Sequence, residues 1–278
     1  MKRLALLAPC LLALTLPPTP PVSASPGAIK HVVVVMEENH SYSAIIGSSA
    51  APYINSLAKT YGLATNYYAI THPSLPNYLA LTTGTTGQGA VAKDCLPAQC
   101  PQSEASIFGQ LTGNWRSYAE SMPTACNKSN AGPYAPRHNP AVYFTRVSAA
   151  VCTGDDQPLP NLATATLGAY TMITPNLLDD MHNGTVAQGD TWLKNHLSAL
   201  MLNPSYADGS TVVFVVWDEG TATDNHVACL VISPRVVATA NATAFTHYSL
   251  LATAEDLLGL PRLGAAQTAT SMQAAFGL

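Results

Sequence analysis

The stretch VVVVMEEN at residues 32–39 decides the fold, because an apolar run passes directly into acid there. An uninterrupted β-branched run of this length is typical of a strand that is buried on both faces, as in a parallel sheet covered by helices. A second stretch, VVFVVWDE at residues 212–219, ends in the same way. The functional crevice of an open α/β sheet lies outside the carboxyl ends of its strands. We therefore expect the two acidic clusters to meet at one site, where a divalent metal would neutralise their charge.

Strands alternate with helices along the whole chain, which favours a layered α/β sheet in one domain. Expected strands lie at 30–36, 63–68, 115–119, 170–174, 211–217 and 227–232, and expected helices at 52–61, 75–83, 107–111, 191–202 and 247–258. The segment at about 85–160 is rich in loops. We interpret it as an insertion over the site.

The composition argues against nucleic acid as a partner. Only 10% of the 278 residues are charged and the formal net charge is −4, so no basic patch is available to neutralise phosphates. We expect a monomer.

Residues 1–24 have the pattern of a secretory signal peptide, with Lys2 and Arg3 before an apolar run and small residues at 22–24. That run is too short to span a bilayer, and no other stretch is long enough. We expect residues 25–278 to be secreted, to the periplasm or the medium, without a transmembrane segment.

Cysteine usage agrees with an oxidising compartment. We favour the pairs Cys95–Cys100 and Cys126–Cys152, although four cysteines allow three pairings. Cys229 lies in an apolar run and is expected to be a buried free thiol.

A serine between two prolines occurs in THPSLPNY at residues 71–78. Ser74 would lie at a helix N-terminus, where backbone N–H groups favour an anion. The alternative is an ordinary helix cap. The GxSxG pattern of an α/β-hydrolase is absent.

Three further polar clusters could carry chemistry. Asp180 and His182 follow an expected strand, Arg137 and His138 lie in a polar loop, and His247 opens the last helix. An Arg side chain offers a fork for phosphate, and a His at a helix N-terminus loses basicity. Loop capping or plain surface exposure remains the alternative for each cluster.

These motifs occur in one order: EN at 38–39, HPSLPNY at 72–78, TPN at 174–176 with Asp180 and His182, WDE at 217–219 and HYS at 247–249. In that order they resemble the secreted acid phosphatase / phospholipase C phosphoesterase family, within the alkaline phosphatase superfamily. The likeness covers nearly all of residues 30–260 and is greatest to short bacterial members, including the mycobacterial secreted acid phosphatase. It implies a three-layer α/β sandwich with a mostly parallel central sheet.

The resemblance implies a metal site made by Glu38, Asn39, Asp218 and Glu219, with Glu37 pointing away. Larger relatives carry an aspartate where Glu219 stands. A ligand set made only of oxygen favours Ca²⁺, Mg²⁺ or Mn²⁺ over Zn²⁺ or iron.

The resemblance also implies that Ser74 is the nucleophile and that His182 and His247 are catalytic. The residues that it implies for substrate binding are Asn39, His72, Arg137, His138 and Asp180. Asp180, His182 and His247 fall where two-metal members bind their second metal. Since the spacing differs, a one-metal site with histidines on the phosphate is an equal alternative.

The expected activity is that of a secreted acid phosphatase acting on phosphate monoesters, with phosphoinositides among the candidate substrates. A phospholipase C-like phosphodiesterase is the first alternative. A metal-free serine hydrolase and a binding protein without turnover are the other two.

Overall fold

A computed structural model of the protein describes residues 28–278, so the expected signal peptide at 1–24 lies outside the described residues. Its centre is a nine-stranded sheet with the order β4-β3-β5-β1-β6-β7-β2-β8, in which β9 also pairs with β2. The strands are β1 His31–Glu37, β2 Gly62–Tyr68, β3 Trp115–Ala119, β4 Asp156–Pro158, β5 Tyr170–Thr174, β6 Thr211–Trp217, β7 His226–Ile232, β8 Thr239–Asn241 and β9 Phe245–Thr246.

The sheet is mostly parallel, as expected. Strands β4, β3, β5, β1 and β6 run in the same direction, and only β7 is antiparallel to its neighbours β6 and β2. The valines at 32–35 of the central strand β1 are fully buried, which explains why that run does not alternate with polar residues.

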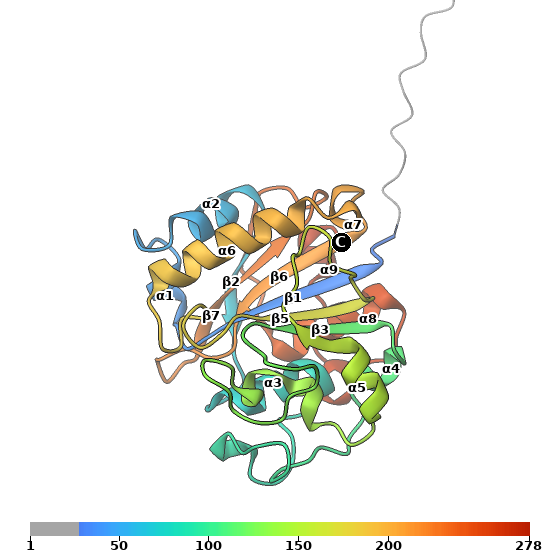
Figure 1. The fold of residues 1–278 in the computed structure, drawn as a ribbon. Coiled ribbons are helices and arrows are strands. Elements are labelled where there is room, and N and C mark those ends of the chain that lie inside the picture. Colours follow the sequence, from blue (N-terminus) through green and yellow to red (C-terminus); the bar gives the residue numbers. More distant parts are fainter. Residues whose placement is uncertain (1–27) are drawn as a thin grey trace, which may run out of the picture.

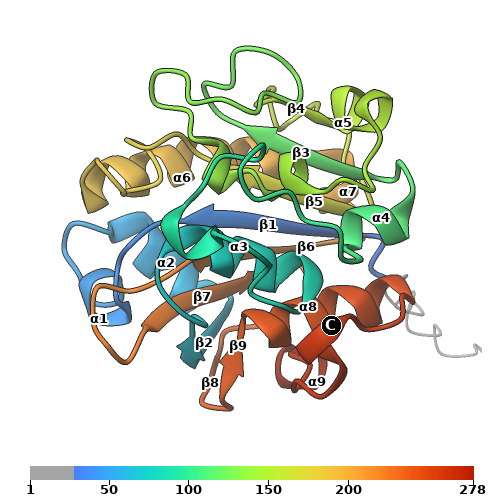
Figure 2. The same cartoon turned by 90° about the horizontal axis from the view of Figure 1, so that it is seen from below.

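Helices cover both faces of the sheet and complete three layers. Figure 1 shows α2 (Pro52–Thr60) and α6 (Val186–Met201) on one side and α3 (Ser74–Thr83) with α8 (His247–Leu258) on the other, and Figure 2 gives the view from below. The shorter helices are α1 Tyr42–Ile45, α4 Ile107–Leu111, α5 Ala149–Asp155, α7 Pro204–Ala207 and α9 Gln273–Phe276. Every residue of α3 is buried, so that helix lies in the core of the protein.

Two elements differ from the sequence-based expectation. Helix α6 begins at Val186, well before the expected residue 191, because the Thr185 hydroxyl accepts a hydrogen bond from the Gln188 N–H and caps it. The segment 85–160 is more than an insertion over the site, since β3 and β4 belong to the central sheet.

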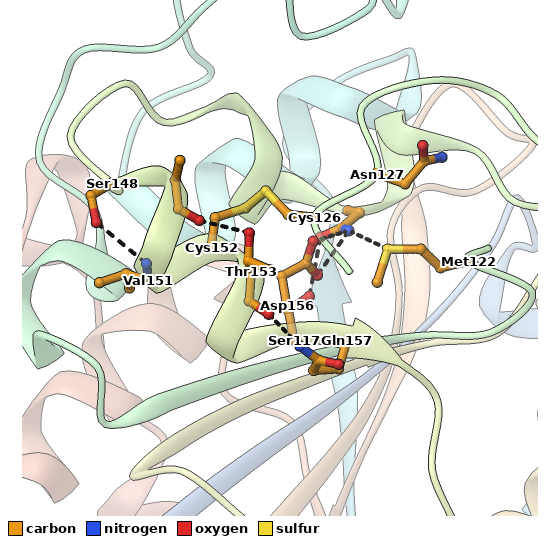
Figure 3. The surroundings of a disulfide bond; sticks show 12 residues. Ser117, Met122, Cys126, Asn127, Ser148, Val151, Cys152, Thr153, Asp156 and Gln157 are labelled. Atoms are coloured by element: carbon orange, nitrogen blue, oxygen red, sulfur yellow. Dashed lines mark hydrogen bonds between the residues drawn. A yellow bond between two sulfur atoms is a disulfide. The ribbon is translucent and has the colours of Figure 1, made fainter. Parts of the chain in front are cut away.

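Both expected disulfides are present. Cys95 pairs with Cys100 and Cys126 pairs with Cys152, while Cys229 is a buried free thiol. Figure 3 shows the second disulfide joining α5 to the loop that follows β3. Within residues 28–278, no helix is both long and apolar enough to cross a membrane.

Candidate active site

The two acidic clusters meet at the carboxyl ends of the neighbouring strands β1 and β6. The Asp218 N–H donates to the Glu37 carbonyl at 2.9 Å, and the Asn39 N–H donates to Asp218 Oδ1 at 3.1 Å. Asn39 adopts a left-handed conformation with φ 51°, which turns the chain back over the end of β6. Glu38 and Asp218 are thereby buried side by side, with no exposed surface.

Helix α3 brings the candidate nucleophile to the same point. Ser74 is its first residue, and the hydroxyl donates to Glu38 Oε2 at 3.1 Å. Tyr78, one turn further along the same helix face, donates its phenol hydrogen to Glu38 Oε1. Two residues of one helix therefore hold both oxygens of one carboxylate.

The segment before Ser74 is fixed by Asn77. Its Oδ1 accepts from the N–H groups of Ile70 and Thr71 at 3.0 and 3.1 Å, and its Nδ2 donates to the Thr71 carbonyl at 2.8 Å. Asn77 is fully buried. The loop that enters α3 is therefore held by its own helix, which fixes where Ser74 stands.

The carboxyl groups of this centre suit a cation. Burial, followed by the charges of Asp218 and Asp180, raises the pKa of Glu38 well above its usual range. Burial also raises the pKa of Asp218, with Glu219 adding to the effect. Asp218 Oδ2 is buried and has no hydrogen-bond partner among the described residues. Two desolvated carboxyl groups with an oxygen left unpaired fit a metal ion between them.

A histidine pair closes another side of Glu38. His138 is buried with Nδ1 3.2 Å from Asp180 Oδ2 and Nε2 3.4 Å from Glu38 Oε1, and its ring stacks on Tyr78. The His182 N–H donates to Asp180 Oδ1 at 2.7 Å. Ligand atoms of Glu38, His138 and His182 all lie within 4.8 Å of one another, so this side could also hold a metal ion.

Burial shifts the pKa values of His138 and of its neighbour Asp180. Burial, then Arg137 and His182, lowers the pKa of His138 well below its usual range, so the ring is neutral. Burial raises the pKa of Asp180 to about 7. A neutral His138 can bind a metal or accept a proton through Nε2, which has no hydrogen-bond partner among the described residues.

His247 contacts the backbone of Asp218 and is fully buried. Its Nε2–H donates to the Asp218 carbonyl at 2.7 Å, and its Nδ1 accepts from the Tyr67 hydroxyl at 3.0 Å. Burial lowers the pKa of His247 to about 4. Both ring nitrogens are thus engaged in holding the end of β6.

His72 and Arg137 are partly exposed residues next to the centre, and Glu219 beside them is buried. His72 Nδ1 lies 2.9 Å from Glu219 Oε2, and burial, followed by the charge of Asp94, raises the pKa of Glu219 to about 7. Arg137 Nη2 lies 3.4 Å from His182 Nε2.

Sequence reasoning missed Tyr78 and Asp94. Asp94 Oδ1 accepts the Leu75 N–H at 3.0 Å, and its Oδ2 lies 3.7 Å from Arg137 Nε. Tyr78 has the helical spacing that places it below Ser74, which was a usable signal. Asp94 had none, because it reaches α3 from an irregular loop.

Comparison with known proteins agrees with this architecture. The model of the phosphoesterase family matches residues 48–261. The phosphatidylinositol-3-phosphatase of Mycobacterium tuberculosis is 34% identical over 96% of this chain and 90% of its own length. The phosphate-repressible acid phosphatase of Penicillium chrysogenum is 32% identical over 76% of this chain, and the acid phosphatase of Aspergillus fumigatus is 30% identical over 91%. The matches span only 55% and 60% of these two fungal proteins.

Solved structures share the fold at low identity. A protein of the alkaline phosphatase superfamily from Vibrio parahaemolyticus superposes with a TM-score of 0.59 at 12% identity, covering 87% of this chain and 70% of its own. The phosphonate monoester hydrolase of Agrobacterium radiobacter superposes with a TM-score of 0.53 at 12% identity, covering 84% and 74%. The expected alkaline phosphatase-like fold is confirmed.

Proposed function

This chain belongs to the phosphoesterase family, and we propose that it is an acid phosphatase that hydrolyses phosphate monoesters with Ser74 as its nucleophile. The observation that carries the proposal is the hydrogen bond from the Ser74 hydroxyl to Glu38 at the start of a buried helix. A serine placed there has carboxylates beside it and helix N–H groups around it, which suits attack on a phosphate. Its relatives are named as phosphatases, which favours monoesters over the phosphodiesterase alternative.

Glu38 and Asp218 would hold one divalent cation, with Asn39 and Glu219 completing an oxygen ligand set. Such a set favours Ca²⁺, Mg²⁺ or Mn²⁺. The proximity of His138 and His182 to Glu38 leaves Zn²⁺ and iron as the alternatives that metal analysis would detect. When bound, the cation supplies positive charge that favours the serine alkoxide and the phosphate oxygens.

Three side chains have direct roles in the proposed reaction. Ser74 Oγ releases its proton to water and attacks phosphorus in line, the bond to the ester oxygen breaks, and a phosphoserine forms that water later hydrolyses. Arg137 donates to the phosphate oxygens as their charge develops. His182 is half-buried and close to Arg137, so we assign it the proton that the leaving alcohol takes up.

The other histidines have supporting roles in this account. His72 is about half exposed and paired with Glu219, so it can contact a phosphate oxygen at the solvent side of the site. His138 and Asp180 form the buried wall beside Glu38. His247 is a positioning residue, because both of its ring nitrogens are engaged with Asp218 and Tyr67.

We further propose secretion and a monomeric state. The Cys95–Cys100 and Cys126–Cys152 disulfides support an oxidising compartment. The mycobacterial relative is named for phosphatidylinositol 3-phosphate, so phosphoinositides are the first natural substrates to test.

The test compares p-nitrophenyl phosphate with bis-(p-nitrophenyl) phosphate, before and after chelation and with Ca²⁺, Mg²⁺, Mn²⁺ or Zn²⁺ restored one at a time. The proposal predicts rapid release of phosphate from the monoester, slow cleavage of the diester, and loss of activity on chelation that one cation reverses. A diester rate equal to the monoester rate would favour the phosphodiesterase. Full activity after verified metal removal would contradict the metal assignment.

A further inference from the structure

We propose that Asn139 and Asp156 form a latch that positions His138 in the phosphate site, with the Cys126–Cys152 disulfide as its anchor. The inference rests on the proposed function, because it assigns a task within that reaction to residues outside the centre. Neither Asn139 nor Asp156 contacts Ser74 or Glu38. Both are positioning residues in this account, since they act through His138.

The latch is a buried pair of side chains that are joined by hydrogen bonds. Asn139 Nδ2 lies 2.9 and 3.0 Å from the two carboxylate oxygens of Asp156. The Ser117 hydroxyl donates to Asn139 Oδ1 at 3.1 Å. Asn139 is 1% exposed and Asp156 is fully buried. Hydrogen bonds in such buried surroundings are stronger than in water and hold their geometry closely.

Asp156 is tied to both halves of the disulfide through its backbone. Its N–H donates to the Cys152 carbonyl at the end of α5, and its carbonyl accepts the Cys126 N–H at 3.0 Å. Figure 3 shows the Asp156 carboxylate directly beside the disulfide, while Asn127 points away from it. The cysteines are bonded to each other, so they are not free to bind a metal with Asp156. We therefore assign this cluster the role of holding the backbone of Asp156 in place.

The latch acts on the residue next to it in sequence. His138 precedes Asn139, and the His138 carbonyl accepts a hydrogen bond of 3.0 Å from the Thr174 hydroxyl at the end of β5. The backbone of His138 is therefore fixed at its own carbonyl and at the residue that follows it. With the backbone fixed, the ring reaches Asp180 and Glu38 together and stacks on Tyr78. Groups that orient a residue of an active site in this way affect activity about 10- to 100-fold when they are changed.

A purely structural role for the pair makes a different prediction. If Asn139 and Asp156 only fill the interior, a change at Asp156 lowers the unfolding temperature and leaves the surviving folded protein fully active. If they position His138, the folded protein itself binds phosphate less well. The decisive quantities are therefore KM, kcat and the dissociation constant of inorganic phosphate, measured on folded enzyme.

The experiment uses Asp156→Asn, the exchanged pair Asn139→Asp with Asp156→Asn, and Asn127→Ala as the matched control. Asn127 lies in the same loop next to Cys126, and its side chain donates to the Ser129 carbonyl outside the latch. We expect Asp156→Asn to raise KM and the phosphate dissociation constant about tenfold. We expect the exchanged pair, which restores a carboxylate–amide contact, to recover most of the loss, and the control to match the wild type.

Ser117→Ala is the milder variant in case Asp156→Asn does not fold, and it should raise KM about threefold through the same network. The imidazole ¹⁵N signals of His138 add a readout independent of turnover, and they should shift in Asp156→Asn and return in the exchanged pair. If the wild type hydrolyses no monoester, the proposed function fails while these signals still test the latch. Folded Asp156→Asn or Ser117→Ala with the wild-type KM, phosphate affinity and His138 signals would overturn the latch, as would an exchanged pair that folds without any recovery.

Discussion

Ser74 donates a hydrogen bond of 3.1 Å to Glu38 Oε2, although 36 positions separate the two residues in the chain. Glu38 directly follows the central strand β1, and Ser74 opens helix α3, so this contact joins the end of the sheet to one covering layer. The other oxygen of Glu38 accepts from Tyr78. One carboxylate therefore sets the position of the candidate nucleophile and takes part in the proposed metal site.

Removing the phenol of Tyr78 tests how tightly that carboxylate must be held. We expect Tyr78→Phe to lower kcat/KM about 10- to 100-fold and to weaken cation binding, because Glu38 loses a hydrogen bond that orients it. Kinetics and cation titration measure both effects. Tyr143→Phe is the matched control, since Tyr143 is also buried and donates to the Cys95 carbonyl. Equal kinetics for Tyr78→Phe and wild type would contradict this role.

The buried carboxyl groups predict how stability depends on pH when no cation is bound. Burial raises the pKa of Asp180 and of Glu219 to about 7, from their ordinary values of 3.8 and 4.5. Between these values the folded protein keeps protons that the unfolded chain has released. The contribution of these two groups to the free energy of unfolding should therefore be fully present below about pH 4. It should be lost as the pH rises through about 7.

A bound cation should reverse that trend, because its ligands must be deprotonated. We expect the cation to raise the unfolding temperature much more at pH 8 than at pH 5. Thermal unfolding at both values, with cation and with chelator, measures the difference. An equal stabilisation at the two values would argue that the carboxylates do not bind the cation.

His247 offers a test of positioning against proton transfer. Its pKa is lowered to about 4, so it is neutral in the range where an acid phosphatase works. A glutamine amide can replace the donor to the Asp218 carbonyl, whereas alanine cannot. We expect His247→Gln to keep activity within about tenfold of the wild type with an unchanged pH profile, and His247→Ala to lose about 10- to 100-fold.

The same pair of substitutions at His182 gives the contrast. If His182 supplies the proton to the leaving group, glutamine and alanine there should be equally poor, at a loss of about 10²- to 10⁴-fold. The loss should be smaller for a substrate with a good leaving group, such as p-nitrophenyl phosphate. A His247→Gln variant as inactive as His247→Ala would return the proton-transfer role to His247.

The sheet and its covering helices could be predicted because they rest on local patterns. The apolar run at 32–36 and the run at 212–217 become neighbouring strands, and their acidic ends meet. The cysteine pairing was also predicted correctly. These features follow from hydrophobic periodicity and from the way that parallel strands align.

The parts that could not be predicted depend on contacts between distant segments. His247 was expected at a helix N-terminus, and it is there, but the Tyr67 hydroxyl decides that its ring faces inward. Asp94 comes from irregular chain and Asp156 opens a strand of only three residues, so no periodicity shows which way either side chain points. Sequence patterns therefore predicted which elements approach the centre, whereas tertiary packing decides which atoms touch.

The most direct test of the account is the rate of phosphate release from p-nitrophenyl phosphate by Ser74→Ala, with cation present. Ser106→Ala is the control, because Ser106 is a buried serine that caps α4 away from the centre. We predict that Ser74→Ala folds, keeps its affinity for the cation within about tenfold, and loses at least about a thousandfold in kcat. The control should match the wild type. Full phosphatase activity in folded Ser74→Ala would contradict the assignment of the nucleophile.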